Sequence, residues 1–143
     1  MIWKIRKIIC SVFVFVLMSC SLNADSVPYL VSGEMVLDTD LYGEASFVFL
    51  LYNKSEKPIS SFTLVFFLFD EDGNPPLSAR SNIVSRIKAD IEPDEQFESS
   101  FSLLKYLSSY PEYPYTVDYL YLSEITYSDG SVWEDPFGLK MFH

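Results

Sequence analysis

The chain has 143 residues, of which 10 are basic and 20 acidic, giving a formal net charge of −10, and 49% of its residues are hydrophobic. A chain of this length holds one ordinary domain, and its apolar fraction excludes intrinsic disorder because it can support a packed core. With only two Cys and one His, most metal-site and thiol chemistry is excluded before any motif is considered.

Residues 1–24 have the three parts of a secretory signal peptide. Three basic residues lie between positions 4 and 7, an apolar run follows over residues 8–18, and small residues end the segment. The run is shorter than the roughly 20 apolar residues that a membrane-spanning helix needs, which disfavours an uncleaved anchor. We therefore predict an exported protein whose single domain covers residues 25–143.

Two cleavage sites compete within this signal. The stretch 17–20, Leu-Met-Ser-Cys, resembles the lipobox of bacterial lipoproteins, in which the Cys becomes the lipidated first residue of the mature chain. Met at the second position departs from that pattern. The alternative is ordinary cleavage after Ala24, although Leu22 is large for its position there. We predict a lipid on Cys20 and a periplasmic or cell-surface lipoprotein; ordinary cleavage would give a soluble periplasmic or secreted protein.

Signal removal makes the remaining chain strongly acidic. It takes away three basic residues and no acid, so residues 25–143 hold 7 basic and 20 acidic side chains, a net charge of −13. Such a surface repels nucleic acids and argues against direct docking on anionic lipid. Membrane contact is therefore predicted only through the anchor. After cleavage before Cys20, this residue is the only Cys in the chain and no disulfide can form within the domain. The hydrophobic core must therefore hold the domain together.

Segments of alternating or continuous apolar residues recur from residue 27 onward, and turn residues separate them. Apolar side chains at every second position are typical of strands with one buried face. A tight hairpin is predicted around Asp129-Gly130, a pair that tolerates the positive φ angles of such turns. A short helix is predicted over residues 102–109, ended by Pro111 and Pro114. The predicted strands cover residues 27–37, 45–52, 62–69, 82–91, 96–101, 115–127 and 132–137.

The predicted fold class is all-β: an Ig-like or fibronectin-III-like antiparallel β-sandwich with Greek-key connections and one short helix. No long helices alternate with the strands, which disfavours a parallel α/β sheet, and a small barrel remains an alternative because alternation alone does not separate it from a sandwich. The predicted core residues are Val31, Met35, Phe47, Phe49, Leu51, Leu64, Phe66, Leu68, Ile87, Phe97, Phe101, Val117, Tyr119, Tyr121, Ile125 and Trp133.

Several turn motifs resemble a known family. Residues 49–55 (Phe-Leu-Leu-Tyr-Asn-Lys-Ser), the turn Lys-Pro-Ile at 57–59, and a strand ending in Asp70 with Gly73 after it resemble the FxLYD-type Ig-like domains of bacterial envelope proteins. In that family a Pro-containing turn then precedes an alternating strand, and residues 91–97 are similar to it. These motifs consist mostly of turn chemistry.

The resemblance covers about residues 45–101. Gly is usual in the family where this chain has Asp94, and the Tyr-rich segment from 106 to 127 is not part of the pattern. What the resemblance implies is an Ig-like sandwich without catalytic residues. It implies no particular ligand.

No set of residues in the sequence builds a catalytic or metal site. Residues 70–74 resemble a calcium loop, but Gly is fourth and position twelve is Ser81, so a solvated turn is predicted. His143 is the only His and the last residue, which leaves zinc sites and Ser-His-Asp triads without ligands or a base. Glu134 and Asp135 are adjacent on a predicted strand, so they point to opposite faces. We predict no enzyme activity, no metal and no cofactor.

The aromatic content is unusual for a sandwich. The strand over residues 62–69 has apolar side chains on both faces, and Tyr119 and Tyr121 add aromatic rings to a later strand. A sandwich strand needs only one apolar face, so the second face needs a cover. The cover is either the N-terminal strand together with residues 102–115, or a partner. Trp133 is predicted to anchor the core or the hairpin.

The absence of a catalytic set, the resemblance and the excess apolar area predict a non-catalytic protein-binding or scaffold module of the cell envelope, whose partner is another envelope protein. The alternative is a carrier of a small hydrophobic ligand with an aromatic-lined pocket. The directions of Phe67, Phe69, Tyr119 and Tyr121 separate the two, because an outward patch favours a partner and an enclosed cavity favours a ligand. Tyrosines that combine apolar area with a hydroxyl are common in recognition surfaces, and four that surround two prolines are predicted partner contacts: Tyr106, Tyr110, Tyr113 and Tyr115.

Overall fold

The fold is known from a computed structural model, which describes residues 27–38, 43–77 and 82–142. The predicted signal peptide, Cys20 and His143 lie outside these ranges. No helix within them is long and apolar enough to cross a membrane. The elements are β1 (Tyr29–Asp38), β2 (Glu44–Asn53), β3 (Ile59–Phe69), β4 (Asn82–Ile91), β5 (Gln96–Ser102), the 3₁₀ helix η1 (Leu104–Tyr106), β6 (Thr116–Tyr127) and β7 (Val132–Glu134).

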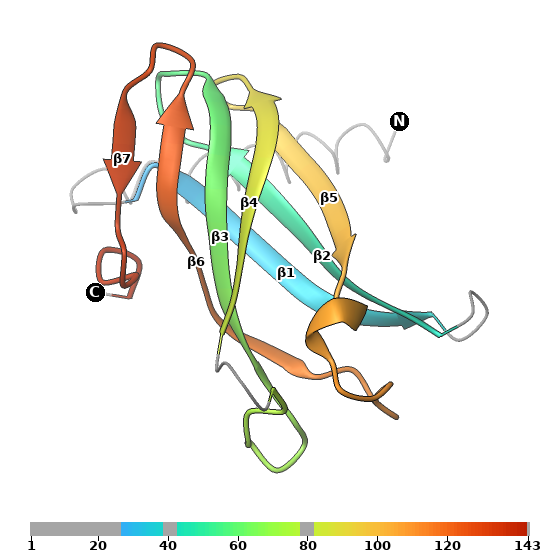
Figure 1. The fold of residues 1–143 in the computed structure, drawn as a ribbon. Coiled ribbons are helices and arrows are strands. Elements are labelled where there is room, and N and C mark those ends of the chain that lie inside the picture. The colour runs from blue at the N-terminus through green and yellow to red at the C-terminus, as the bar shows by residue number, and fades with distance from the viewer. Residues whose placement is uncertain (1–26, 39–42, 78–81, 143) are drawn as a thin grey trace, which may run out of the picture.

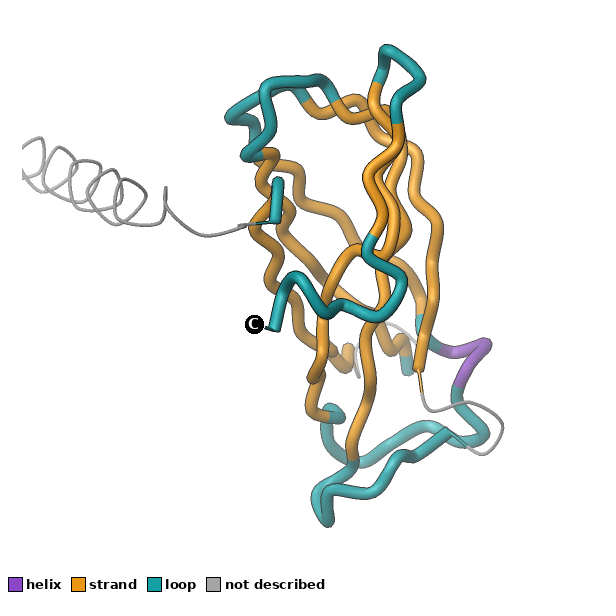
Figure 2. The backbone as a smooth tube through the Cα atoms, turned by 90° about the vertical axis from the view of Figure 1, so that its left-hand side faces the viewer, coloured by secondary structure: helices purple, strands orange, loops and turns teal. Residues whose placement is uncertain are grey.

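Two antiparallel sheets pack face to face (Figures 1 and 2). One has the strand order β1-β2-β5 and the other has the order β4-β3-β6-β7. The chain changes sheet between β2 and β3, between β4 and β5, and between β5 and β6, which are Greek-key connections. The predicted all-β sandwich is therefore confirmed, and the barrel alternative is wrong because the two sheets remain separate. The helix predicted over residues 102–109 is reduced to the three-residue 3₁₀ helix η1, because β5 continues to Ser102.

Aromatic rings fill the space between the sheets. Phe66 of β3 is fully buried and stacks on Phe47 of β2, with ring centroids 4.0 Å apart. Phe101 of β5 contacts both of these rings, and Phe97 and Phe62 extend the cluster along the sandwich. Since each ring comes from the inward face of an alternating strand, the period-2 pattern of the sequence accounts directly for this core.

The predicted core is correct except on β6. All but two of the predicted residues are in the core cluster or pack against it; the exceptions are Tyr119 and Tyr121. Tyr119 is 52% exposed, and Tyr121 is buried on the outer face of its sheet. The prediction omitted several residues that the core does contain, namely Tyr29, Ile59, Phe62, Ile83, Ile91, Leu103, Leu122 and Tyr127.

Two β-bulges explain the error on β6. Opposite Phe66, between the pairs Val65–Tyr121 and Phe67–Asp118, β6 has one residue more than β3. A second extra residue lies between the partners of Thr63 and Leu64. Each extra residue moves the next side chains to the other face, so strict alternation assigns the wrong face to the middle of the strand.

The buried side chain of Asn53 joins two turns at one end of the sandwich. Its Nδ2 donates to the carbonyl oxygens of Lys57 (2.9 Å) and Ile91 (3.0 Å), while its Oδ1 accepts from the backbone N–H and the hydroxyl of Ser55. Its backbone also pairs with Asp94 and Glu95. Asp94 has a φ of 63°, a conformation that Gly adopts without cost. The β2–β3 and β4–β5 turns are thus held through one side chain.

Tyr29 forms a polar link between the two sheets. Its ring is fully buried and packs edge-on against Trp133, which confirms that Trp133 packs on the core. The backbone N–H of Leu122 on β6 donates to the Tyr29 hydroxyl at 2.9 Å. Burial raises the pKa of this hydroxyl from 10.0 to about 12, because an ionised phenol would lose its hydration.

The raised pKa of Tyr29 predicts alkaline destabilisation. The folded state holds this proton more tightly than the unfolded chain, so the contribution is fully present below pH 10 and disappears as pH rises from 10 to about 12. By linkage the loss is on the order of 2–3 kcal/mol. Urea titrations across this range should show a smaller loss in Tyr29→Phe than in the natural chain, although the variant starts less stable because Leu122 N–H loses its acceptor. Equal losses in both proteins would contradict the assignment.

Candidate functional site

The outer face of the four-stranded sheet holds an open groove lined by aromatic side chains. Phe67 and Phe69 point into it from β3, because their neighbours Phe66 and Leu68 occupy the inward positions. The groove has a volume of about 750 Å³. Its lining comes from β3, β4, β6, the β3–β4 loop and the C-terminal segment: Phe67, Phe69, Pro75, Asn82, Tyr119, Tyr121, Pro136, Phe137, Gly138, Leu139 and Phe142.

A bulge in β6 places Tyr119 at the centre of this groove. Tyr119 has a φ of 49°, which is uncommon for a side chain of this size and costs about 1–2 kcal/mol. Asp118 supports the bulge, since its Oδ1 accepts from the Tyr119 backbone N–H at 2.8 Å. The Tyr119 ring then lies edge-on to Phe67 and Phe142, with centroid separations of 5.6 and 5.7 Å. Backbone strain of this kind gathers at functional sites.

The C-terminal segment after β7 forms the other wall of the groove. Figure 2 shows its backbone beside the strands. Its turn is held by the buried Asp135, whose Oδ2 accepts from the Lys140 backbone N–H at 3.1 Å. The Tyr121 hydroxyl donates to the Pro136 carbonyl at 3.1 Å, which ties the segment to the sheet. Gly138 has a φ of 68° and lies so close to Tyr121 that a Cβ would come within 2.9 Å of the ring. This wall therefore depends on a Gly at 138.

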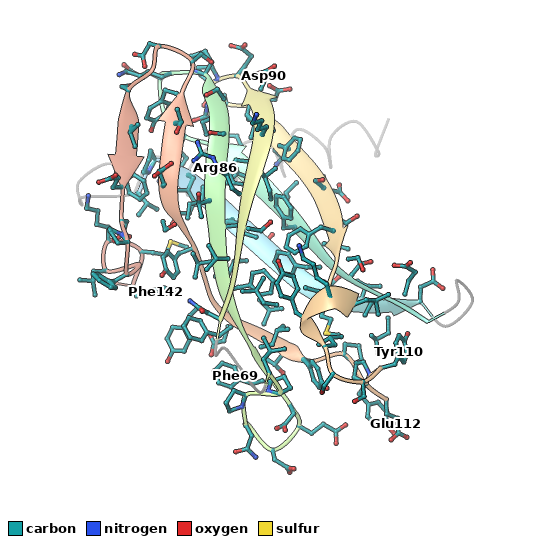
Figure 3. The ribbon with its side chains drawn as sticks, in the orientation of Figure 1. Phe69, Arg86, Asp90, Tyr110, Glu112 and Phe142 are labelled. Carbon is teal, nitrogen blue, oxygen red and sulfur yellow. The ribbon has the colours of Figure 1, made fainter. Side chains whose placement is uncertain are left out.

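The wall presents unusually exposed apolar side chains. Phe137 is 78% exposed, and Leu139 and Phe142 are each more than half exposed. Together with Tyr119 they make one contiguous apolar surface around the groove, the kind of surface that marks an interaction site on a soluble domain. Figure 3 shows Phe142 and Phe69 on the same side of the sandwich. Sequence analysis singled out Phe67, Phe69, Tyr119 and Tyr121 but missed this segment; the signal was three large apolar residues following the last strand.

The groove has an apolar lining with few polar groups. Among the described residues, no charged side chain lines it, and its polar groups are tyrosine hydroxyls and Asn82. Glu134 is exposed whereas Asp135 is buried, so the two carboxylates do not converge. In the β3–β4 loop, Asp70 Oδ1 accepts from the backbone N–H groups of Asp72 and Asn74, as in a hydrogen-bonded turn. Across the described ranges, no three His, Cys, Asp or Glu side chains are grouped to hold a metal ion.

The four tyrosines of the β5–β6 connection lie away from this groove. Tyr106 and Tyr115 pack against the core. Tyr110 is partly exposed, its ring lies beside Gly43, and its hydroxyl donates to the Glu44 carbonyl at 3.2 Å. Only Tyr113 is largely free of such contacts. Figure 3 shows Tyr110 on the opposite side from Phe142, so the connection and the groove are separate surfaces. Their role as partner contacts stays a prediction.

Replacement of Tyr119 should reverse the usual order of Gly and Ala. In an ordinary strand Gly is less stable than Ala, but at a positive φ the Ala variant keeps the strain and the Gly variant loses it. Tyr119→Gly should therefore be more stable than Tyr119→Ala by about 1 kcal/mol. Urea unfolding of the two variants measures this difference directly. An Ala variant as stable as the Gly variant would contradict the left-handed backbone at this position.

Comparison with known proteins shows a similarity of fold only. A solved structure of a hypothetical protein from Peptoclostridium difficile 630 superposes with a TM-score of 0.60, covering 77% of this chain and 87% of that chain at 15% sequence identity. No protein-family model matches the sequence. No curated protein matches it either.

Proposed function

We propose that the protein is a non-catalytic, exported binding module of the bacterial cell envelope, whose aromatic groove takes a segment of another envelope protein. The observation that carries the proposal is the outward direction of Phe67, Phe69 and Tyr119, which form one open patch with the C-terminal segment. Large exposed apolar patches are rare on monomeric soluble domains unless they bind something. The resemblance to accessory FxLYD-type domains adds support, and we propose that relationship as well.

Site-specific photocrosslinking in native membranes tests the binding role. A photoreactive residue at position 119 should give a discrete protein adduct. The same residue at Val48, on the outer face of the other sheet, should give none. Adducts at both positions, or at neither, would oppose a partner in the groove. A pull-down with Tyr110, Tyr113 and Tyr115 changed to Ser tests the β5–β6 connection separately: equal recovery of partners would exclude that surface.

A carrier role is the second candidate, favoured by the volume of about 750 Å³ and the aromatic lining. Ligand sites of this size usually enclose most of the molecule they bind. The groove is open, so we rank this role second. Solvent extraction of the purified protein followed by mass spectrometry would decide: a stoichiometric small molecule that is lost in Phe67→Ala, without any crosslinked protein, would replace the binding-module proposal.

We also propose export with a lipid on Cys20. The support is the order of basic, apolar and small residues in positions 1–20. Radiolabelled fatty acid should enter the natural protein and should be absent from Cys20→Ser. An unlabelled mature chain beginning at Asp25 would show that ordinary cleavage is right.

A further inference from the structure

The rim of the aromatic groove is acidic although its lining is uncharged. Phe69 is followed directly by Asp70, and Glu71 and Asp72 are exposed in the same loop. In the sequence, residues 70–81 hold three acids and one base, a net of −2; the base, Arg80, lies outside the described residues.

β6 contributes a further acid to the same rim. Asp118 pairs with Phe67 across the β3–β6 ladder, and its side chain is exposed beside the groove. Directly paired residues project from the same face of a sheet, so this carboxylate stands next to the aromatic lining. The groove is thus flanked by negative charge from two different elements.

The basic side chain of the C-terminal wall does not offset this rim. Lys140 belongs to the C-terminal wall, but its Nζ donates to the Glu134 carbonyl at 3.0 Å and lies 5.1 Å from the centroid of the Trp133 ring. Its charge is therefore held at β7 rather than over the groove. Arg86 lies further along the sheet and pairs with Glu124 at 3.7 Å.

We infer that the occupant of the groove is an extended protein segment with large apolar side chains flanked by lysine or arginine; this rests on the binding role proposed above. The apolar residues would bury the exposed rings, while basic flanks would meet the rim and the faces of the aromatic rings. A second copy of this chain fits poorly, because residues 25–143 carry a net charge of −13 and would bring like charges together. Anionic lipid is disfavoured for the same reason.

Fluorescence anisotropy with the full-length protein in detergent micelles tests this chemistry. The probes are synthetic peptides whose core positions are randomised over Leu, Phe, Tyr, Trp and Pro and whose flanks are Lys, Gly or Glu. The Lys-flanked pool should bind at least about tenfold more tightly than the Gly-flanked pool, and added salt should shrink this advantage. The Glu-flanked pool should bind weakest.

Charge-removing variants locate the effect. The double change Glu71→Gln and Asp72→Asn should remove most of the Lys advantage and leave Gly-flanked binding unchanged. Asp70 and Asp118 are kept because their carboxylates hold the turn and the bulge. The matched control removes the same charge from two exposed acids elsewhere, Glu98 and Glu112, each changed to Gln, and should keep the advantage.

Four contrary results would overturn the inference, and they distinguish a wrong partner chemistry from a wrong binding role. Equal binding of all three pools, lost in Phe67→Ala, would leave the binding role intact and refute the basic flanks. No peptide binding while a crosslinker at position 119 still captures a protein would refute the proposed partner chemistry alone. Neither binding nor crosslinking would refute the binding role as well. Binding to lipid vesicles in place of peptides would assign the groove to a membrane surface.

Discussion

Replacing Phe66 by Ala is expected to lower the free energy of unfolding by roughly 3–5 kcal/mol, the cost of deleting a large ring from a packed core. Phe66 is fully buried, stacks on Phe47 and contacts Phe101. Because small domains have only about 5–15 kcal/mol of stability, this variant should unfold at markedly lower urea concentration.

Phe67→Ala is the matched control on the next residue. Phe67 is only partly buried and faces the groove, so its removal should cost well under half as much while abolishing capture at the groove. Urea unfolding monitored by circular dichroism compares the two variants. Equal destabilisation would mean that the two faces of β3 are assigned wrongly.

Asn53→Ala should be the most damaging polar substitution that the described residues offer, at about 3 kcal/mol or more. It would leave the buried carbonyl of Ile91 without this donor and the backbone N–H of Ser55 without its acceptor. The carbonyl of Lys57, at an exposed residue, would keep its hydrogen bond from the Ser55 hydroxyl. Each buried polar group left unpaired costs about 1–3 kcal/mol. Since both turns depend on this amide, the loss should loosen them together.

Two further variants define the cause. Asn53→Asp keeps the acceptor for Ser55 but sets a carboxylate against two carbonyl oxygens, so it should be no more stable than Asn53→Ala. Asn74→Ala, at an exposed loop position, should stay within about 0.5 kcal/mol of the natural chain. Thermal unfolding ranks the three proteins. A stable Asn53→Asp would show that the donors of this amide are unimportant.

Much of the fold could be predicted because alternation is a local signal. The inward faces of β2 and β5 follow directly from rings at every second residue, as in Phe47 and Phe49 or Phe97 and Phe101. The hairpin before β7 was marked by Asp129-Gly130, and Gly130 does have a positive φ of 86°. Here local sequence and tertiary packing demand the same conformation.

The candidate site could be predicted only in part, since its shape depends on a β-bulge and on a contact between distant residues, neither of which an alternating pattern indicates. Period-2 patterning put Tyr119 in the core, whereas an added residue in β6 turns it outward. The wall formed by the C-terminal segment depends on Gly138 meeting Tyr121, a contact between residues 17 positions apart that no local pattern marks. The Tyr-rich connection was predicted as a contact surface from its composition, but two of its four tyrosine rings pack against the core.

The bulge at Tyr119 consists of one added residue, so a single codon decides whether the groove has this ring. Without this residue β6 would continue Val117-Asp118-Leu120-Tyr121-Leu122, in which inward and outward side chains alternate without interruption. The residues on either side of position 119 would keep their inward or outward direction, so β6 would still pair with β3. One inserted triplet thus suffices to add the Tyr119 ring to the groove, and one deletion suffices to remove it, while the core sequence stays unchanged.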